Sequence, residues 1–173
     1  GKVLREFALK YPEKKFIGYD LSGKNIEMAK KKYPLANISY IKGNAANEFD
    51  LQEKIDLIYS FSFIQYFDEE NSIKLSNNIS NILSNKGFVV HMSIPDIKHN
   101  YRIMFPEKIN LKSIIIFLIK VIKKYFLKQG IKYGKNGFWW SKSKLISHYK
   151  SNFSEVSYLS SDSWYRFDII ARK

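Results

Sequence analysis

The stretch that decides the fold is Phe16–Ser22, FIGYDLS, an apolar run that ends on the acidic residue Asp20. It predicts a short buried strand over Phe16–Asp20 and a helix that Ser22 caps. Asp20 stands nineteen positions after Gly1. In nucleotide-binding α/β units a glycine-rich turn opens a helix, and an acid about 20 residues later binds the ribose hydroxyls. We therefore expect such a unit here, beginning at the end of its glycine-rich turn and lacking the strand before it.

Short helices and strands alternate through the first 96 residues. The helical patterns are Lys2–Tyr11, Ser22–Tyr33 and Asp68 to about Leu83, and the strand patterns are Phe16–Asp20, Ile38–Ile41, Ile55–Ser60 and Phe88–Ser93, the last entered through a turn at Asn85–Gly87. The strands are continuous apolar runs, as in a parallel sheet covered on both faces. After a helix from Ser141 to about Tyr149, two further strands, Glu155–Leu159 and Trp164–Ala171, predict a hairpin. The expected fold is α/β and doubly wound, with a mostly parallel sheet, a C-terminal antiparallel hairpin and its first strand missing.

Composition excludes several classes of protein. The 173 residues are 45% hydrophobic and 26% charged, an ordinary mixture for one folded unit. The chain has no cysteine and only three scattered histidines, so we expect no metal site. Its longest apolar run, Ile114–Ile119, is far shorter than the ~20 residues that span a bilayer, so we expect a cytoplasmic protein.

The positive charge lies almost entirely in the second half of the chain. Residues 1–96 hold 13 Lys and Arg against 12 Asp and Glu, whereas residues 97–173 hold 16 against 4. Within Ile109–Lys128, lysines alternate with large aliphatic residues, as in a basic helix at an anionic membrane surface or in a lid helix over a substrate cleft. Both interpretations stay open. The same interleaving argues against a nucleic-acid partner.

Taken in order, these segments resemble the class I S-adenosylmethionine-dependent methyltransferases. The similarity covers residues 1–96 and 141–173, with residues 97–140 as a basic apolar insertion. The segments that carry it are FIGYDLSGKNIEMAKKKYP, IKGNAA, FDLQEKIDLIYSFSFIQYF, LSNKGFVVHMSIPD, SKSKLISHYKSNFSEV and WYRFDIIARK. No single motif is decisive, but their order and spacing are specific. The resemblance divides the chain into a cofactor-binding core, an insertion, and a final helix with antiparallel strands.

The resemblance also implies site residues. Gly1 would end the glycine-rich loop, Asp20 would bind the ribose hydroxyls and Leu21 would lie against adenine; a turn or helix-capping acid is the alternative for Asp20. Asn44 and Ala45 would meet the adenine edge, unless they form a simple turn. The methionine part would lie against Ser60 and Phe61. Tyr66 and Asp96 are candidate bases, and His91 is expected to be a core histidine. Three aromatics either line the acceptor site or are simply buried: Phe138, Trp139 and Trp140.

The implied activity is methyl transfer from S-adenosylmethionine to a small-molecule acceptor or to one linked to a sugar or polysaccharide. An NAD(P)-dependent oxidoreductase shares the acidic strand end, and a non-catalytic remnant or partner module would keep the fold without the cofactor. Loss of the first strand would remove half of the cofactor cradle and leave the fragment inactive. A peripheral location at the inner membrane face, through residues 109–128, is the alternative to a purely cytoplasmic one.

Overall fold

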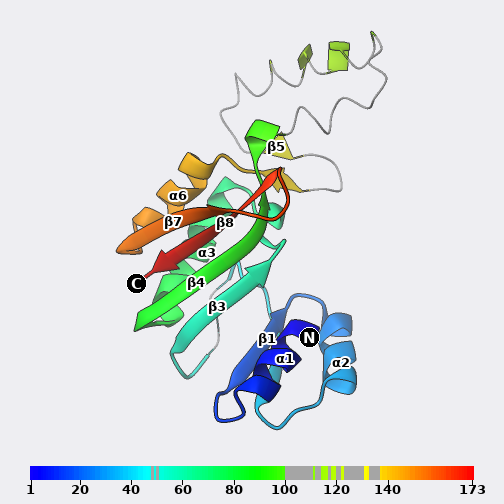
Figure 1. Cartoon of the computed structure of the whole chain (residues 1–173), viewed down its shortest axis with the longest axis vertical. Helices are drawn as coiled ribbons and strands as arrows, with labels where there is room; N and C mark the ends of the chain where they lie inside the picture. The colour runs from blue at the N-terminus through cyan, green and yellow to red at the C-terminus, as the bar shows by residue number, and fades with distance from the viewer. Residues whose placement is uncertain are drawn as a thin grey trace. The chain divides into compact units, whose positions relative to one another are not determined.

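The computed structural model describes residues 1–47, 49, 51–99, 111, 114–116, 118, 119, 122, 131, 132 and 137–173. The chain forms two compact units, residues 1–50 and residues 51–173 (Figure 1). The predicted boundaries at 96/97 and 140/141 stay predictions, because most residues between them lie outside the described part.

Unit 1 is a parallel two-stranded sheet with two helices. Its elements are α1 (Lys2–Lys10), β1 (Phe16–Asp20), α2 (Gly23–Lys32) and β2 (Ile38–Lys42), close to the predicted ranges. The Ser22 hydroxyl caps α2 by accepting a hydrogen bond from the Asn25 amide at 3.3 Å. The strands pair in register from Phe16 opposite Ile38 to Asp20 opposite Lys42. Asp20 therefore ends its strand at the same edge as the loop that follows β2.

Unit 2 is built on a four-stranded sheet in the order β3 (Ile55–Phe61), β4 (Leu83–Pro95), β8 (Arg166–Arg172) and β7 (Glu155–Ser160). The pair β3–β4 is parallel, whereas β8 is antiparallel to both β4 and β7 (Figure 1). The α/β fold and the terminal hairpin are confirmed. The missing first strand stays a prediction.

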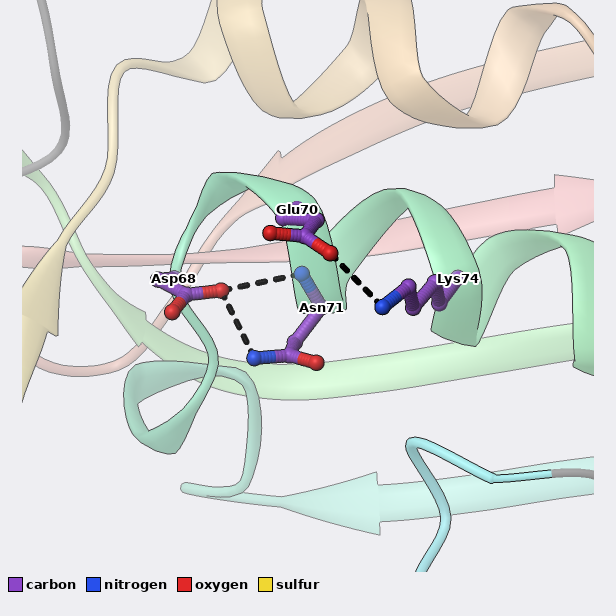
Figure 2. A network of polar contacts seen from close by, with 4 residues as sticks. All are labelled: Asp68, Glu70, Asn71 and Lys74. Carbon is purple, nitrogen blue, oxygen red and sulfur yellow. Dashed lines mark hydrogen bonds and ion pairs between the residues drawn. The ribbon is translucent and has the colours of Figure 1, made fainter.

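The helices α3 (Glu69–Ile82) and α6 (Lys142–Lys150) pack on one face of this sheet and on each other. The core between them is mostly apolar and includes Leu75, Ile79, Leu83, Val89, Ile94, Trp140, Leu145, Tyr149, Phe167 and Ile169. Figure 2 shows how α3 begins: Asp68 Oδ1 accepts hydrogen bonds from the backbone and side-chain nitrogens of Asn71, each at 2.9 Å. Glu70 and Lys74, which are one helical turn apart, form an ion pair at 2.7 Å. The predicted cap is therefore confirmed.

The structure differs from the expectation at the start of β4. The predicted turn at Asn85–Gly87 is wrong as a boundary, because β4 already begins at Leu83 opposite Ile55 and resumes pairing at Phe88 opposite Leu57. The residues between bulge out of the ladder. A Cβ on Gly87 would lie 3.0 Å from the Ile55 carbonyl oxygen, so the bulge closes on a glycine.

The expected burial of both sheet faces is also incomplete. Leu57, Tyr59 and Phe61 lie on one face of β3, the face away from α3 and α6, and all three are exposed. The other short elements are the 3₁₀ turns η1 (Ile64–Tyr66) and η2 (Ile97–His99) and a small antiparallel pair, β5 (Ile131–Lys132) and β6 (Phe138–Trp139).

The lysine-rich helix predicted over residues 111–128 lies mostly outside the described residues. Those described there are helical, and their apolar side chains are exposed: Leu111, Ile114, Ile115, Ile116, Leu118, Ile119 and Ile122. In the described part of the chain, no helix has the length and hydrophobicity needed to cross a membrane.

Candidate functional site

Asp20 stands at the carboxyl end of β1 and turns the chain into α2. Its Oδ1 accepts a hydrogen bond from the Ser22 amide at 2.8 Å, and Oδ2 lies 3.3 Å from the side-chain nitrogen of Asn25. The turn contact expected of a capping acid is therefore present. The turn contact uses Oδ1, and Oδ2, which accepts from Asn25, keeps further acceptor capacity, since an ionised carboxylate offers about four lone-pair sites. Next to it, Leu21 is 66% exposed and presents an apolar surface.

The loop after β2 lies against the end of β1. The Gly43 amide donates to the Asp20 carbonyl oxygen at 3.0 Å. A Cβ on Gly43 would overlap the Tyr19 hydroxyl, so glycine allows this close approach. Asn44 Oδ1 accepts from the Ala46 amide at 3.0 Å, which is the turn contact named as its alternative role, and Ala45 lies between the two partners. The loop and Asp20 thus share one edge of unit 1.

Gly1 is the N-cap of α1. Its carbonyl oxygen accepts the first helical hydrogen bond, from the Arg5 amide at 3.0 Å. A Cβ there would come within 2.8 Å of the Tyr33 ring, so the position is tight. Its assignment to a glycine-rich loop stays a prediction.

In unit 2, the partly buried Ser60 is hydrogen-bonded to a buried polar pair, His91 and Tyr149. Its hydroxyl lies 2.6 Å from His91 Nδ1, and the Tyr149 hydroxyl lies 2.8 Å from His91 Nε2. Burial lowers the pKa of His91 to about 3 and raises the pKa of Tyr149, so both are neutral near pH 7. A neutral imidazole has one donor and one acceptor nitrogen, so it can bond both neighbours. His91 is a satisfied core histidine, as expected, and it orients the Ser60 hydroxyl. Phe61, the next residue, is 61% exposed.

Two serines at the carboxyl ends of β3 and β4 adopt the left-handed backbone region. Ser62 has φ 50° and Ser93 has φ 63°, values that non-glycine residues rarely adopt. Asp168 Oδ1 accepts the Ser93 amide at 2.8 Å, and Arg166 Nη1 donates to the Ser93 carbonyl oxygen at 2.5 Å. Backbone strain of this kind concentrates at functional sites, where surrounding contacts hold it in place. Sequence reasoning missed this cluster, because a serine gives no local signal of positive φ.

Asp96 and Tyr66, the candidate bases, both follow strand ends in unit 2. Asp96 is buried; its Oδ1 accepts from the Lys98 amide at 2.9 Å and its Oδ2 lies 3.3 Å from Lys142 Nζ. These contacts give Asp96 a structural role in the turn. Tyr66 lies in η1 and is 67% exposed. For neither residue do these contacts test the predicted catalytic role.

The three aromatics that precede α6 differ in exposure. Trp139 and Trp140 are buried, and Trp140 Nε1 donates to the Ile64 carbonyl oxygen at 3.3 Å. Phe138 is only partly buried. The described residues contain no group of three side chains arranged to hold a metal ion.

A family model described as "Methyltransferase domain" matches residues 1–87. The chain belongs to the methyltransferase-domain family. This confirms the resemblance to class I S-adenosylmethionine-dependent methyltransferases, and the matched residues carry the whole of unit 1, with β3 and α3 of unit 2. A comparison with proteins of curated function found no match.

Solved structures share the fold of this methyltransferase domain. A protein from Nostoc punctiforme, provisionally assigned as an O-methyltransferase, has a TM-score of 0.66 and 19% identity over 98% of this chain and 48% of its own. An O-methyltransferase family protein from Burkholderia thailandensis has a TM-score of 0.65 and 9% identity over 98% of this chain and 47% of its own. The N-methyltransferase NodS from Bradyrhizobium japonicum, solved with S-adenosylhomocysteine, has a TM-score of 0.56 and 14% identity over 91% of this chain and 65% of its own. The domain thus spans only about half to two thirds of these relatives.

Proposed function

We propose that this chain binds S-adenosylmethionine and serves methyl transfer to a small-molecule acceptor. The observation that carries the proposal is the family match over residues 1–87, which includes the strand that ends on Asp20. The complex of NodS with S-adenosylhomocysteine supports the same cofactor.

Unit 1 supplies the nucleoside contacts in this proposal. Asp20 holds its turn through Oδ1 and offers the remaining acceptor capacity of Oδ2, beside its contact with Asn25, to the ribose hydroxyls, as acids at this position of nucleotide-binding folds do. The exposed Leu21 side chain supplies an apolar face for adenine. The Asn44 side-chain amide and the Ala45 backbone N–H supply polar groups for the adenine edge. In unit 2, we assign Ser60 and Phe61 to the methionine part.

The chemistry asks for placement more than for activation. S-adenosylmethionine supplies a methyl group that is already activated as a sulfonium. The protein then has to hold the acceptor atom in line with it, and needs a base only where the acceptor is a hydroxyl. The rigid carboxyl ends of β3 and β4, with their strained serines, are suited to such positioning.

Calorimetric titration separates the cofactor hypotheses. S-adenosylhomocysteine and NAD(P) are titrated separately into the full-length protein. We expect saturable heat of binding with S-adenosylhomocysteine and none with NAD(P). The opposite result would favour the oxidoreductase, and no heat with either would favour a non-catalytic module.

We further propose that residues 109–128 contact an anionic membrane surface and bring the enzyme to a sugar- or polysaccharide-linked acceptor. The apolar residues of this segment named above support the proposal, because exposing so many apolar side chains of one segment to water is unfavourable. The lysines at 112, 120, 123, 124 and 128 fit an anionic surface. Flotation with phosphatidylglycerol vesicles should require this segment, with pure phosphatidylcholine vesicles as the control. Equal flotation after deletion of residues 109–128 would leave the lid interpretation.

A further inference from the structure

Arg166 is the first residue of β8 and lies at the end of the sheet where β3 and β4 finish. It pairs with Pro95, the last residue of β4. Because β8 runs antiparallel to β4, its first residue meets the carboxyl ends of the parallel strands. Ligands of open α/β sheets bind at that edge. Arg166 is only partly buried there, so a ligand can reach it.

Within the part of the chain that the structure describes, only one of the three guanidinium nitrogens of Arg166 makes hydrogen bonds. Nη1 donates to the Ser93 carbonyl oxygen at 2.5 Å and lies 3.3 Å from the Ser62 and Ser93 hydroxyls and 3.4 Å from Gln65 Oε1. Nε and Nη2 make no hydrogen bond to any residue that the structure describes. These two nitrogens form one side of the guanidinium plane, and their parallel N–H groups match the two oxygens of a carboxylate or phosphate.

The charge of Arg166 also lacks an anionic partner among the described residues. No carboxylate in that part of the chain lies within ion-pair distance of its guanidinium. The nearest acid along β8 is Asp168, which is buried and bound to the Ser93 amide. An arginine is always charged, so its partly buried guanidinium gains from a bound anion.

The contacts of Arg166 fix the direction in which the Nε–Nη2 edge of its guanidinium points. Its guanidinium lies 5.1 Å from the centre of the Tyr165 ring, and Tyr165 in turn contacts the half-exposed Trp164, with ring centres 5.2 Å apart. The strained Ser62 and Ser93 hold the Nη1 side. A guanidinium fixed on one side and over one face loses little entropy when it binds a ligand with the remaining edge.

From this geometry we propose that the Nε–Nη2 edge of Arg166 binds a carboxylate or phosphate group of the methyl acceptor. The proposal rests on the proposed function, and it narrows the acceptor to an anionic molecule. The same chemistry could come from the carboxylate of the cofactor, so the experiment separates these two sources.

The first measurement uses the unaltered protein. With ¹⁵N-labelled arginine assigned through triple-resonance spectra, benzoate and inorganic phosphate are titrated as probes. We expect a saturable shift of the Arg166 Nε–H signal with at least one probe. Arg172, at the other end of β8 and 3.9 Å from Glu155, is the internal control and should not saturate. Equal responses of both arginines would indicate only nonspecific attraction of anions and would overturn the proposal.

The second measurement uses Arg166→Lys and the matched control Arg172→Lys. Lysine keeps the charge but lacks the planar fork, so we expect at least tenfold weaker probe binding for Arg166→Lys and no change for Arg172→Lys. S-adenosylhomocysteine affinity should be the same in both. A tenfold loss of that affinity in Arg166→Lys alone would assign the anion to the cofactor and overturn the acceptor assignment. Failure of the unaltered protein to bind S-adenosylhomocysteine would refute the proposed function, while the probe titration would still decide whether Arg166 binds anions.

Discussion

The buried His91 makes a quantitative prediction for the acid stability of unit 2. Its imidazole is fully buried between Ser60 and Tyr149, and burial lowers its pKa from 6.5 to about 3. The folded state therefore resists protonation that the unfolded state accepts. The stabilisation from a neutral His91 is complete above the unfolded pKa of 6.5 and is lost as the pH falls toward 3. Over the full range this depression corresponds to at most about 5 kcal/mol.

The assay is urea unfolding of the unaltered protein and of His91→Gln, in steps from pH 8 to pH 4. Tryptophan fluorescence reports on unit 2 alone, because all three tryptophans of the chain, Trp139, Trp140 and Trp164, lie there. One proton taken up only by the unfolded state gives a slope of about 1.4 kcal/mol per pH unit. Below pH 6 we expect the unaltered protein to lose stability faster than His91→Gln by roughly this slope. Above pH 7.5 the two curves should run parallel, which serves as the control. Parallel curves down to pH 4 would refute the burial of a neutral His91.

Two further changes test local features of the fold in unit 2. Asp68→Ala removes the cap of α3 and should lower the free energy of unfolding by about 1 kcal/mol. Glu70→Gln breaks only an exposed ion pair and should leave the free energy of unfolding nearly unchanged in the same urea assay. Gly87→Ala pushes a methyl group against the Ile55 carbonyl and should lower the free energy of unfolding by about 1 to 3 kcal/mol, and with it the urea midpoint. An unchanged midpoint would show that the bulge can move aside.

Those parts of the fold that depend on neighbouring residues could be predicted from the sequence. The apolar run Phe16–Asp20, the Ser22 cap and the Asp68 cap each act over a few positions, and the structure has all three. The hairpin of β7 and β8 follows from two apolar runs around a serine-rich turn. Its place beside β4 was not predicted, because strand order depends on contacts between distant segments.

The polar network at the strand ends could not be predicted in the same way. Arg166 reaches Ser62 and Gln65 across about a hundred positions of sequence, and no local pattern reports such a contact. The positive φ values of Ser62 and Ser93 depend on that network and on Asp168. The bulge at Gly87 was missed because a glycine after Asn85 and Lys86 has the composition of an ordinary turn. For Ser60 the sequence placed the residue at the strand end, while its bond to His91 needed the register of β3 with β4.

The central claim is that Asp20 binds the ribose of S-adenosylmethionine, and calorimetric titration of S-adenosylhomocysteine into Asp20→Asn tests it most directly. Asparagine keeps the oxygen that accepts the Ser22 amide but loses the charge that strengthens bonds from ribose hydroxyls. We expect affinity to fall by roughly 10- to 100-fold, the equivalent of about 1.5 to 3 kcal/mol for a hydrogen bond to a charged group. Glu27→Gln, an exposed acid on α2, should bind like the unaltered protein. Equal affinity of Asp20→Asn and Glu27→Gln would contradict the account.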